Sequence, residues 1–155
     1  MTADTVVILF TRLPRPGVGK SRLLPALGAD GVQALQAALL ARTIDVIGQA
    51  GCGAVELWTD LPDVGSEPAV PPAWPRHVQG SGDVGERMAR ALADALGRYQ
   101  AAVLVGSDCG SLTASVLDAA AAALRDGADG VVAPAEDGGY VLIGLRGRVP
   151  AGLFR

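Results

Sequence analysis

Residues 5–23 read TVVILFTRLPRPGVGKSRL and join a short apolar run to a loop rich in glycine, proline and cations. The run Val6–Phe10 predicts a buried strand. The loop contains Lys20, the only lysine among 13 lysines and arginines. Glycines let a backbone bring its N–H groups close to an anion, and an ammonium adds a compact positive charge. The stretch therefore predicts an α/β fold whose first strand leads into a phosphate-binding loop. The alternative is an ordinary solvated lysine.

Predicted strands and helices alternate along the rest of the chain. Strands are expected at residues 5–10, 54–59, 77–79, 101–106, 130–134 and 140–145, and helices at residues 30–49, 85–96 and 113–124. This order predicts an α/β domain with a mostly parallel sheet and helices on both faces. Asp30 and Thr113 are the expected helix caps, with Gln33 completing a capping box at Asp30.

Size and composition limit the function classes. A chain of 155 residues fits one domain, residues 1–155, and half of its residues are hydrophobic but only 4% are aromatic, which predicts a core of Ala, Val and Leu. A net charge of −3 argues against a nucleic-acid-binding protein. The local cluster of Arg12, Arg15, Lys20 and Arg22 suits a small polyanion instead.

Cysteine, histidine and hydropathy patterns point to a cytoplasmic protein. Cys52 and Cys109 belong to no zinc or disulfide pattern, which favours a reducing compartment. The start of the chain does not resemble a signal peptide, and no apolar stretch approaches the roughly 20 residues of a membrane span. His77, the only histidine, is expected at the surface, which disfavours a triad hydrolase. A homo-oligomer is left open.

The segment around Lys20 does not complete a Walker A motif. Gly19, Lys20 and Ser21 match the end of the pattern GxxxxGK[ST], but the required first glycine falls on Pro14. Proline has no backbone N–H for the phosphate cradle. The sequence therefore argues against a P-loop ATPase.

Two carboxylates are candidates for a divalent metal. Asp108 directly follows the strand at residues 101–106, and Asp137 lies in the segment Glu136–Tyr140. Ligands of open α/β sheets bind outside the carboxyl ends of the strands, and Mg²⁺ often binds through one or two carboxylates together with substrate phosphates. The alternative is that Asp108 is a turn residue.

The segment from Gln79 to Met88 also follows a predicted strand. Asp83 and Glu86 have the spacing of a helix capping box, and we expect this structural role for both. Gly80 and Gly82 could bring the backbone close to a base or a sugar.

Four segments together resemble a known bacterial family. They are Pro14–Leu23, Gln79–Met88, Gly106–Cys109 and Pro134–Tyr140. In order and spacing they are similar to transferases of the glycosyltransferase-A fold, also described as nucleotide-diphospho-sugar transferase-like, whose substrate is mostly unassigned. That family is distantly similar to 2-phospho-L-lactate guanylyltransferase and to molybdenum-cofactor guanylyltransferase. The resemblance covers roughly residues 5–154.

The resemblance implies a nucleotide held above the sheet, with Mg²⁺ or Mn²⁺ at Asp108 assisted by Asp137. Lys20, Asp108 and Asp137 would be the catalytic residues. The positions expected to bind the nucleotide are Pro16, Gly17, Lys20, Arg22, Gly80 and Gly82. The chain departs from the family pattern at Gly110, where a proline is usual. It also stops some tens of residues early, which suggests a C-terminally truncated or divergent member.

The sequence therefore predicts a Mg²⁺-dependent, glycosyltransferase-like enzyme that uses a nucleotide-activated donor and an unknown small-molecule acceptor. The first alternative is a nucleotidyltransferase that uses a nucleoside triphosphate. A catalytically silent nucleotide-binding module is the alternative from another class.

Overall fold

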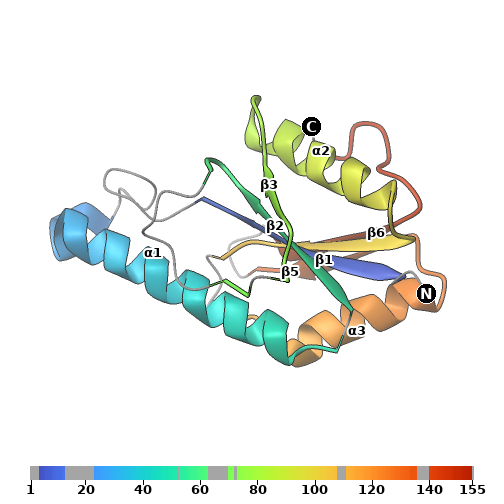
Figure 1. Cartoon of the computed structure of the whole chain (residues 1–155), viewed down its shortest axis with the longest axis horizontal. Coiled ribbons are helices and arrows are strands. Elements are labelled where there is room, and N and C mark those ends of the chain that lie inside the picture. The colour runs from blue at the N-terminus through green and yellow to red at the C-terminus, as the bar shows by residue number, and fades with distance from the viewer. Residues whose placement is uncertain are drawn as a thin grey trace.

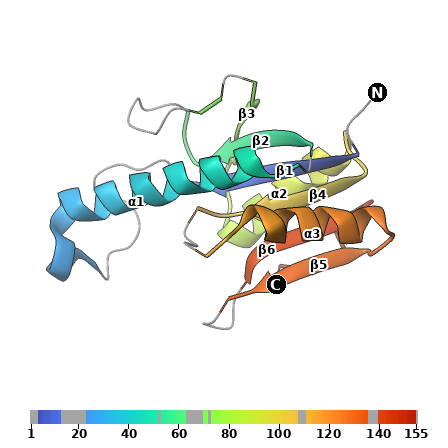
Figure 2. The same ribbon diagram turned by 90° about the horizontal axis from the view of Figure 1, so that it is seen from below.

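A six-stranded sheet forms the centre of the computed structural model, which describes residues 4–12, 23–51, 53–62, 70–71, 73–107, 111–135 and 140–154. The sheet lies between the helices (Figure 1), and its spatial order is β3-β2-β1-β4-β6-β5 (Figure 2). The strands are β1 (Thr5–Thr11), β2 (Ala54–Thr59), β3 (Arg76–Val78), β4 (Ala101–Val105), β5 (Gly130–Pro134) and β6 (Tyr140–Arg146).

The sheet is mostly parallel, as predicted. β1 pairs in parallel with β2 on one side and with β4 on the other, and β2 pairs in parallel with β3. β6 runs antiparallel to both of its neighbours, β4 and β5. Five strands therefore point the same way, and their carboxyl ends share one edge of the sheet.

Helices cover both faces of the sheet, as predicted. They are α1 (Leu24–Gln49) and α3 (Ala114–Arg125) on one face and α2 (Val84–Leu96) on the other (Figure 2). Side chains of β1 alternate between the two layers: Val7 and Leu9 pack with α1 and α3, whereas Val6 and Ile8 pack with α2. All four are fully buried, which explains why this central strand is a continuous apolar run.

The start of α1 differs from the prediction. The helix begins at Leu24 rather than Asp30, and helical geometry is interrupted at Gly28, whose φ is +70°. Asp30 therefore lies inside the helix and is not its N-cap, and Leu23 at the N-cap position makes no side-chain capping bond. The physical reason is that Gly28 tolerates a left-handed φ, so a helical turn forms on either side of a kink.

The other elements lie within two residues of their predicted bounds. The short strand β3 lies at one edge of the sheet. The Thr113 hydroxyl accepts a 3.2 Å hydrogen bond from the N–H of Val116 and caps α3, as predicted. In the described part of the chain, no helix is both long enough and apolar enough to cross a membrane.

Gly144 lets α3 pack closely on the sheet. A Cβ at this position of β6 would lie 2.8 Å from Val131 Cγ2 and 2.9 Å from Leu124 Cδ1. We expect Gly144→Ala to lower the free energy of unfolding by about 1–3 kcal/mol, as overpacking does in well-packed cores. Denaturant titration measures this loss. Gly130→Ala is the matched control, because its added Cβ would meet only ordinary contacts at 3.4 Å and beyond; an equal loss in both variants would contradict the packing role.

Candidate functional site

The candidate site lies at the carboxyl edge of the sheet, where β1 and β4 are neighbours. From β1 the chain passes through α1 to β2 and β3 on one side, and then returns through α2 to β4 on the other side of β1. In open α/β sheets, ligands bind at such a topological switch point. The hydroxyls of Thr11 and Ser107 lie 2.6 Å apart there and join the ends of the two strands.

The predicted catalytic and metal-binding residues fall outside the described residues. Lys20, with Pro16, Gly17 and Arg22, belongs to residues 13–22, which follow β1, and Asp108 follows Ser107. Asp137 belongs to residues 136–139, which join β5 to β6. The described strand ends that flank all three segments lie at the same edge of the sheet.

The two predicted metal ligands belong to segments that extend from neighbouring strands. Val105, near the end of β4, is paired with Leu142 of β6. Neighbouring strands lie about 4.8 Å apart, so the described ends of β4 and β6 that adjoin these two segments lie close together. Among the described residues, no three His, Cys, Asp or Glu side chains gather into a metal-binding group.

Gln79 is a buried polar residue beside the carboxyl ends of β1 and β2, and only 1% of it is exposed. Its Nε2 donates to the carbonyls of Thr11 and Trp58, each at 3.0 Å, and its Oε1 accepts from Arg87 Nη1 at 2.8 Å. Its backbone N–H donates to the Thr59 carbonyl at 2.8 Å. One residue therefore connects β1, β2 and α2 immediately after β3.

The glycines of the following loop have structural roles of their own. Gly80 and Gly82 have φ of +84° and +110°, a region that disfavours other residues. Arg90 Nη1 donates to the carbonyls of Gln79 and Ser81 at 2.7 and 2.9 Å, and a Cβ on Gly80 would lie 2.8 Å from that nitrogen. A contact of either glycine with a nucleotide stays a prediction.

The capping box predicted at α2 is confirmed. Asp83 accepts a 2.8 Å hydrogen bond from the N–H of Glu86, and Glu86 Oε1 accepts one from the N–H of Asp83 at 3.4 Å. The bond from the Glu86 N–H is the largest effect that holds the pKa of Asp83 below its ordinary value. The ionised Asp83 carboxylate therefore stabilises the folded state above the ordinary carboxyl pKa, and this contribution is lost as the pH falls through its lowered pKa.

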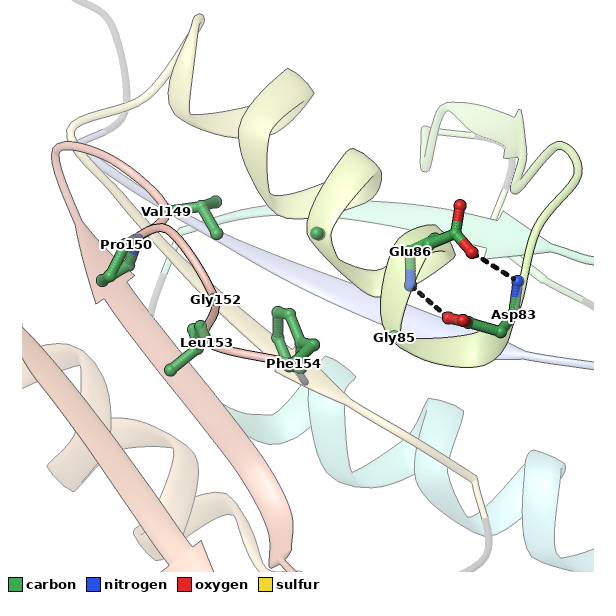
Figure 3. A pocket seen from close by; sticks show the side chains of 9 residues that line it. Asp83, Gly85, Glu86, Val149, Pro150, Gly152, Leu153 and Phe154 are labelled. Atoms are coloured by element: carbon green, nitrogen blue, oxygen red, sulfur yellow. Dashed lines mark hydrogen bonds between the residues drawn. The ribbon is translucent and has the colours of Figure 1, made fainter.

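A pocket of about 290 Å³ lies beside this capping box (Figure 3). The first turns of α2 form one wall and the segment 149–154 forms the other. Figure 3 shows the Phe154 ring on the side of Gly85, with the Asp83 and Glu86 carboxylates bonded to the backbone next to it. The pocket therefore lies between the start of α2 and the last described residues of the chain.

Gly85 permits this close contact. A Cβ there would lie 2.8 Å from the carbonyl oxygen of Phe154. We expect Gly85→Ala to displace the segment 149–154 and so to accelerate amide exchange there, measured by mass spectrometry, although alanine favours a helix over glycine by up to about 1 kcal/mol. Gly48→Ala is the control, because nothing lies within 4 Å of its added Cβ. Unchanged exchange in Gly85→Ala would contradict the contact.

A second polar cluster was not anticipated from the sequence. Glu56 of β2 is 2% exposed, and both of its carboxylate oxygens accept from Arg98 Nη2 at 2.7 Å. These bonds hold the pKa of Arg98 above its ordinary value. His77 is not simply a surface residue: 29% of its side chain is exposed, and its ring stacks on Trp58 at a centroid distance of 4.4 Å.

The signal for this cluster is weak in the sequence. An alternating strand suggests that a glutamate faces water. In the structure, Arg98 beyond the end of α2 and Trp58 Nε1 offset the cost of burying its charge. Gln79 was part of a recognised segment, but nothing in that segment indicates a buried amide. The contact between the Thr11 and Ser107 hydroxyls leaves no local signal, because it spans 96 positions of the chain.

Comparison with known proteins supports the fold and identifies relatives. Residues 27–155 match the sequence model of a bacterial family, DUF2064, described as uncharacterized protein conserved in bacteria. A crystal structure from Desulfovibrio desulfuricans G20, provisionally named a nucleotide-diphospho-sugar transferase, matches with a TM-score of 0.81 and 26% identity. That match covers 95% of this chain and 64% of the other, so this chain spans less than two thirds of that protein.

Two structures of Rv0371c from Mycobacterium tuberculosis H37Rv are similar in fold. The complex with manganese matches with a TM-score of 0.55 and 18% identity, and covers 92% of this chain and 71% of that one. The other structure matches with a TM-score of 0.56 and 21% identity, and covers 92% of this chain and 72% of that one. Among curated proteins, none matches this chain in sequence. These likenesses confirm the predicted α/β fold of the nucleotide-diphospho-sugar transferase type.

Proposed function

The chain belongs to the bacterial family DUF2064, and from this premise we propose that it is a metal-dependent transferase that acts on a nucleotide-activated donor. The first candidate reaction is glycosyl transfer from a nucleotide sugar. The observation that carries the proposal is the switch point between β1 and β4, where the Thr11 and Ser107 hydroxyls meet at 2.6 Å. The segments with the only lysine and with Asp108 begin on its two sides.

Each predicted residue has a role in this proposal. Lys20 and Arg22 would bind the donor phosphates, and the backbone at Pro16 and Gly17 would approach them closely. Asp108 and Asp137 would hold Mg²⁺ or Mn²⁺. Such a cation, when bound, neutralises charge on phosphate oxygens and so stabilises a leaving nucleotide phosphate. Gly80 and Gly82 would bring the loop backbone close to the base or sugar.

The structural relatives support a nucleotide donor and a metal. The name of the Desulfovibrio desulfuricans protein indicates a nucleotide-diphospho-sugar donor, and one Rv0371c structure contains manganese. Carboxylate and water ligands suit both Mg²⁺ and Mn²⁺. Because the chain spans 64% of the first relative, its acceptor and its complete reaction are part of the proposal.

A nucleotidyltransferase is the second candidate. The basic residues Arg12, Arg15, Lys20 and Arg22 fit a triphosphate slightly better than a diphosphate, because there is more charge to neutralise. The two reactions break different bonds. Glycosyl transfer breaks the bond between the anomeric carbon and the phosphate oxygen, and a nucleoside diphosphate leaves. Nucleotidyl transfer breaks the bond from the α-phosphorus to its bridging oxygen, and pyrophosphate leaves.

The test is a thermal-shift screen of nucleoside triphosphates and nucleotide sugars with and without Mg²⁺ or Mn²⁺, followed by an assay of slow donor hydrolysis. Ligands that bind only the folded state raise the Tm. Release of nucleoside diphosphate from a nucleotide sugar supports glycosyl transfer, and release of pyrophosphate from a nucleoside triphosphate supports nucleotidyl transfer. A shift without turnover supports a silent binding module. No shift with any nucleotide would contradict the donor site.

A further inference from the structure

The buried carboxamide of Gln79 does more than fill space. Both hydrogens of its Nε2 are used, on the carbonyls of Thr11 and Trp58, and its Oε1 is used by Arg87. Burying an amide is unfavourable unless its hydrogen bonds are made, and here the bonds to Thr11, Trp58 and Arg87 are all made. The bonds themselves are therefore the distinctive feature of this position.

These bonds end at the edge where the donor would bind. Thr11 is the last residue of β1, and its hydroxyl meets that of Ser107, the residue before Asp108. Hydrogen bonds thus connect Arg87 on α2 to Gln79, Gln79 to the Thr11 carbonyl, and the Thr11 hydroxyl to Ser107 after β4. Together they cross three elements that are far apart in the sequence.

We propose that Gln79 is a positioning residue for the donor site: through its carboxamide bonds it fixes the end of β1, from which the phosphate-binding segment starts, relative to β2 and α2. This inference rests on the proposed function, because it concerns the residue that positions the proposed donor site. Gln79 acts through Thr11 and touches no reacting atom. Arg87 fixes the orientation of the amide, because its guanidinium can only donate and so selects Oε1.

Two substitutions remove these bonds in different ways. Gln79→Met keeps the length of the side chain but leaves the Thr11 and Trp58 carbonyls and the Arg87 guanidinium without this partner. Gln79→Glu keeps a partner for Arg87 but places a carboxylate oxygen against two carbonyl oxygens. Each change leaves buried polar groups without hydrogen bonds, which costs more free energy than the loss of a hydrogen bond at the surface.

The experiment measures binding of inorganic tripolyphosphate with Mn²⁺ by calorimetry, well below the Tm of each variant. This probe has no base or sugar and reports on the phosphate site alone. We expect both Gln79 variants to weaken binding about tenfold or more, which corresponds to about 1.4 kcal/mol. Arg87→Met keeps the amide and frees only its Oε1, so a smaller weakening is expected. If the Gln79 variants do not fold, the affinity of Arg87→Met tests the positioning role instead.

Glu56→Gln is the matched control. It changes another buried polar group on β2, whose charge is paired with Arg98 beyond the C-terminal end of α2. Glutamine keeps the Oε1 that accepts from Trp58 Nε1 at 3.1 Å, so a general loss of stability should lower the Tm of this variant without changing the affinity. Equal loss of affinity in Glu56→Gln, or wild-type affinity in the Gln79 and Arg87 variants, would overturn the positioning role alone. Failure of the wild-type protein to bind tripolyphosphate with Mn²⁺ would overturn the donor site and the role of Gln79 with it.

Discussion

Replacing Asp108 with alanine is expected to reduce metal-dependent donor turnover by about 100-fold or more, a loss typical of a group that stabilises charge in the transition state. The metal would lose a carboxylate that extends from the carboxyl end of β4. Turnover is measured as release of the nucleotide product at saturating donor. The shift in Tm produced by the nucleotide should also no longer depend on Mg²⁺ or Mn²⁺.

Asp129→Ala is the control for Asp108→Ala. Asp129 precedes β5 at the opposite edge of the sheet and is exposed, so its replacement removes an equal charge away from the site. Wild-type turnover is expected in this variant. Retention of metal-dependent turnover in Asp108→Ala would show that Asp108 is only the turn residue of the alternative interpretation.

Replacing Lys20 with alanine is expected to weaken nucleotide binding about tenfold or more, because a compact ammonium close to phosphate oxygens is removed. Calorimetry with the nucleotide that gives the largest thermal shift measures this loss. Lys20→Arg should restore part of the affinity, since the charge is kept but the planar guanidinium does not reproduce the point charge of an ammonium.

Arg148→Ala removes the same charge at a different place. Arg148 is exposed and follows β6, whose carboxyl end lies at the opposite edge of the sheet. Its replacement therefore tests whether net charge alone governs nucleotide affinity, and little change is expected. Unchanged affinity in Lys20→Ala would contradict the assignment of this residue to the phosphates.

The strands were predictable because their signal is local. Val6–Phe10 and Ala101–Val105 are apolar runs, and such runs occupy central strands that are buried on both faces. The start of α1 was not predictable from the same signals. Asp30 and Gln33 have the spacing of a capping box, but the helix continues to Leu24 through the kink at Gly28. A local capping pattern cannot show whether the preceding turn also becomes helical.

The candidate site was predictable only in outline. Clusters after strands indicated the carboxyl edge, and the strand order shows why that edge has a switch point between β1 and β4. The contacts that organise it are not local: Gln79 bonds to Thr11 over 68 positions, and Thr11 meets Ser107 over 96. Neither contact leaves a periodicity or a motif in the sequence.

By itself the sequence TVVILFTRLPRPGVGKSRL determined that a buried strand leads into a basic, Gly-rich segment, because apolar runs and glycines act locally. The alternation of elements likewise determined an α/β sheet. Only the tertiary structure decided which strand ends meet, that Glu56 is buried with Arg98, and that Gln79 joins β1 and β2 to α2. Buried polar groups are stable only with partners in place, and those partners come together only when distant segments pack.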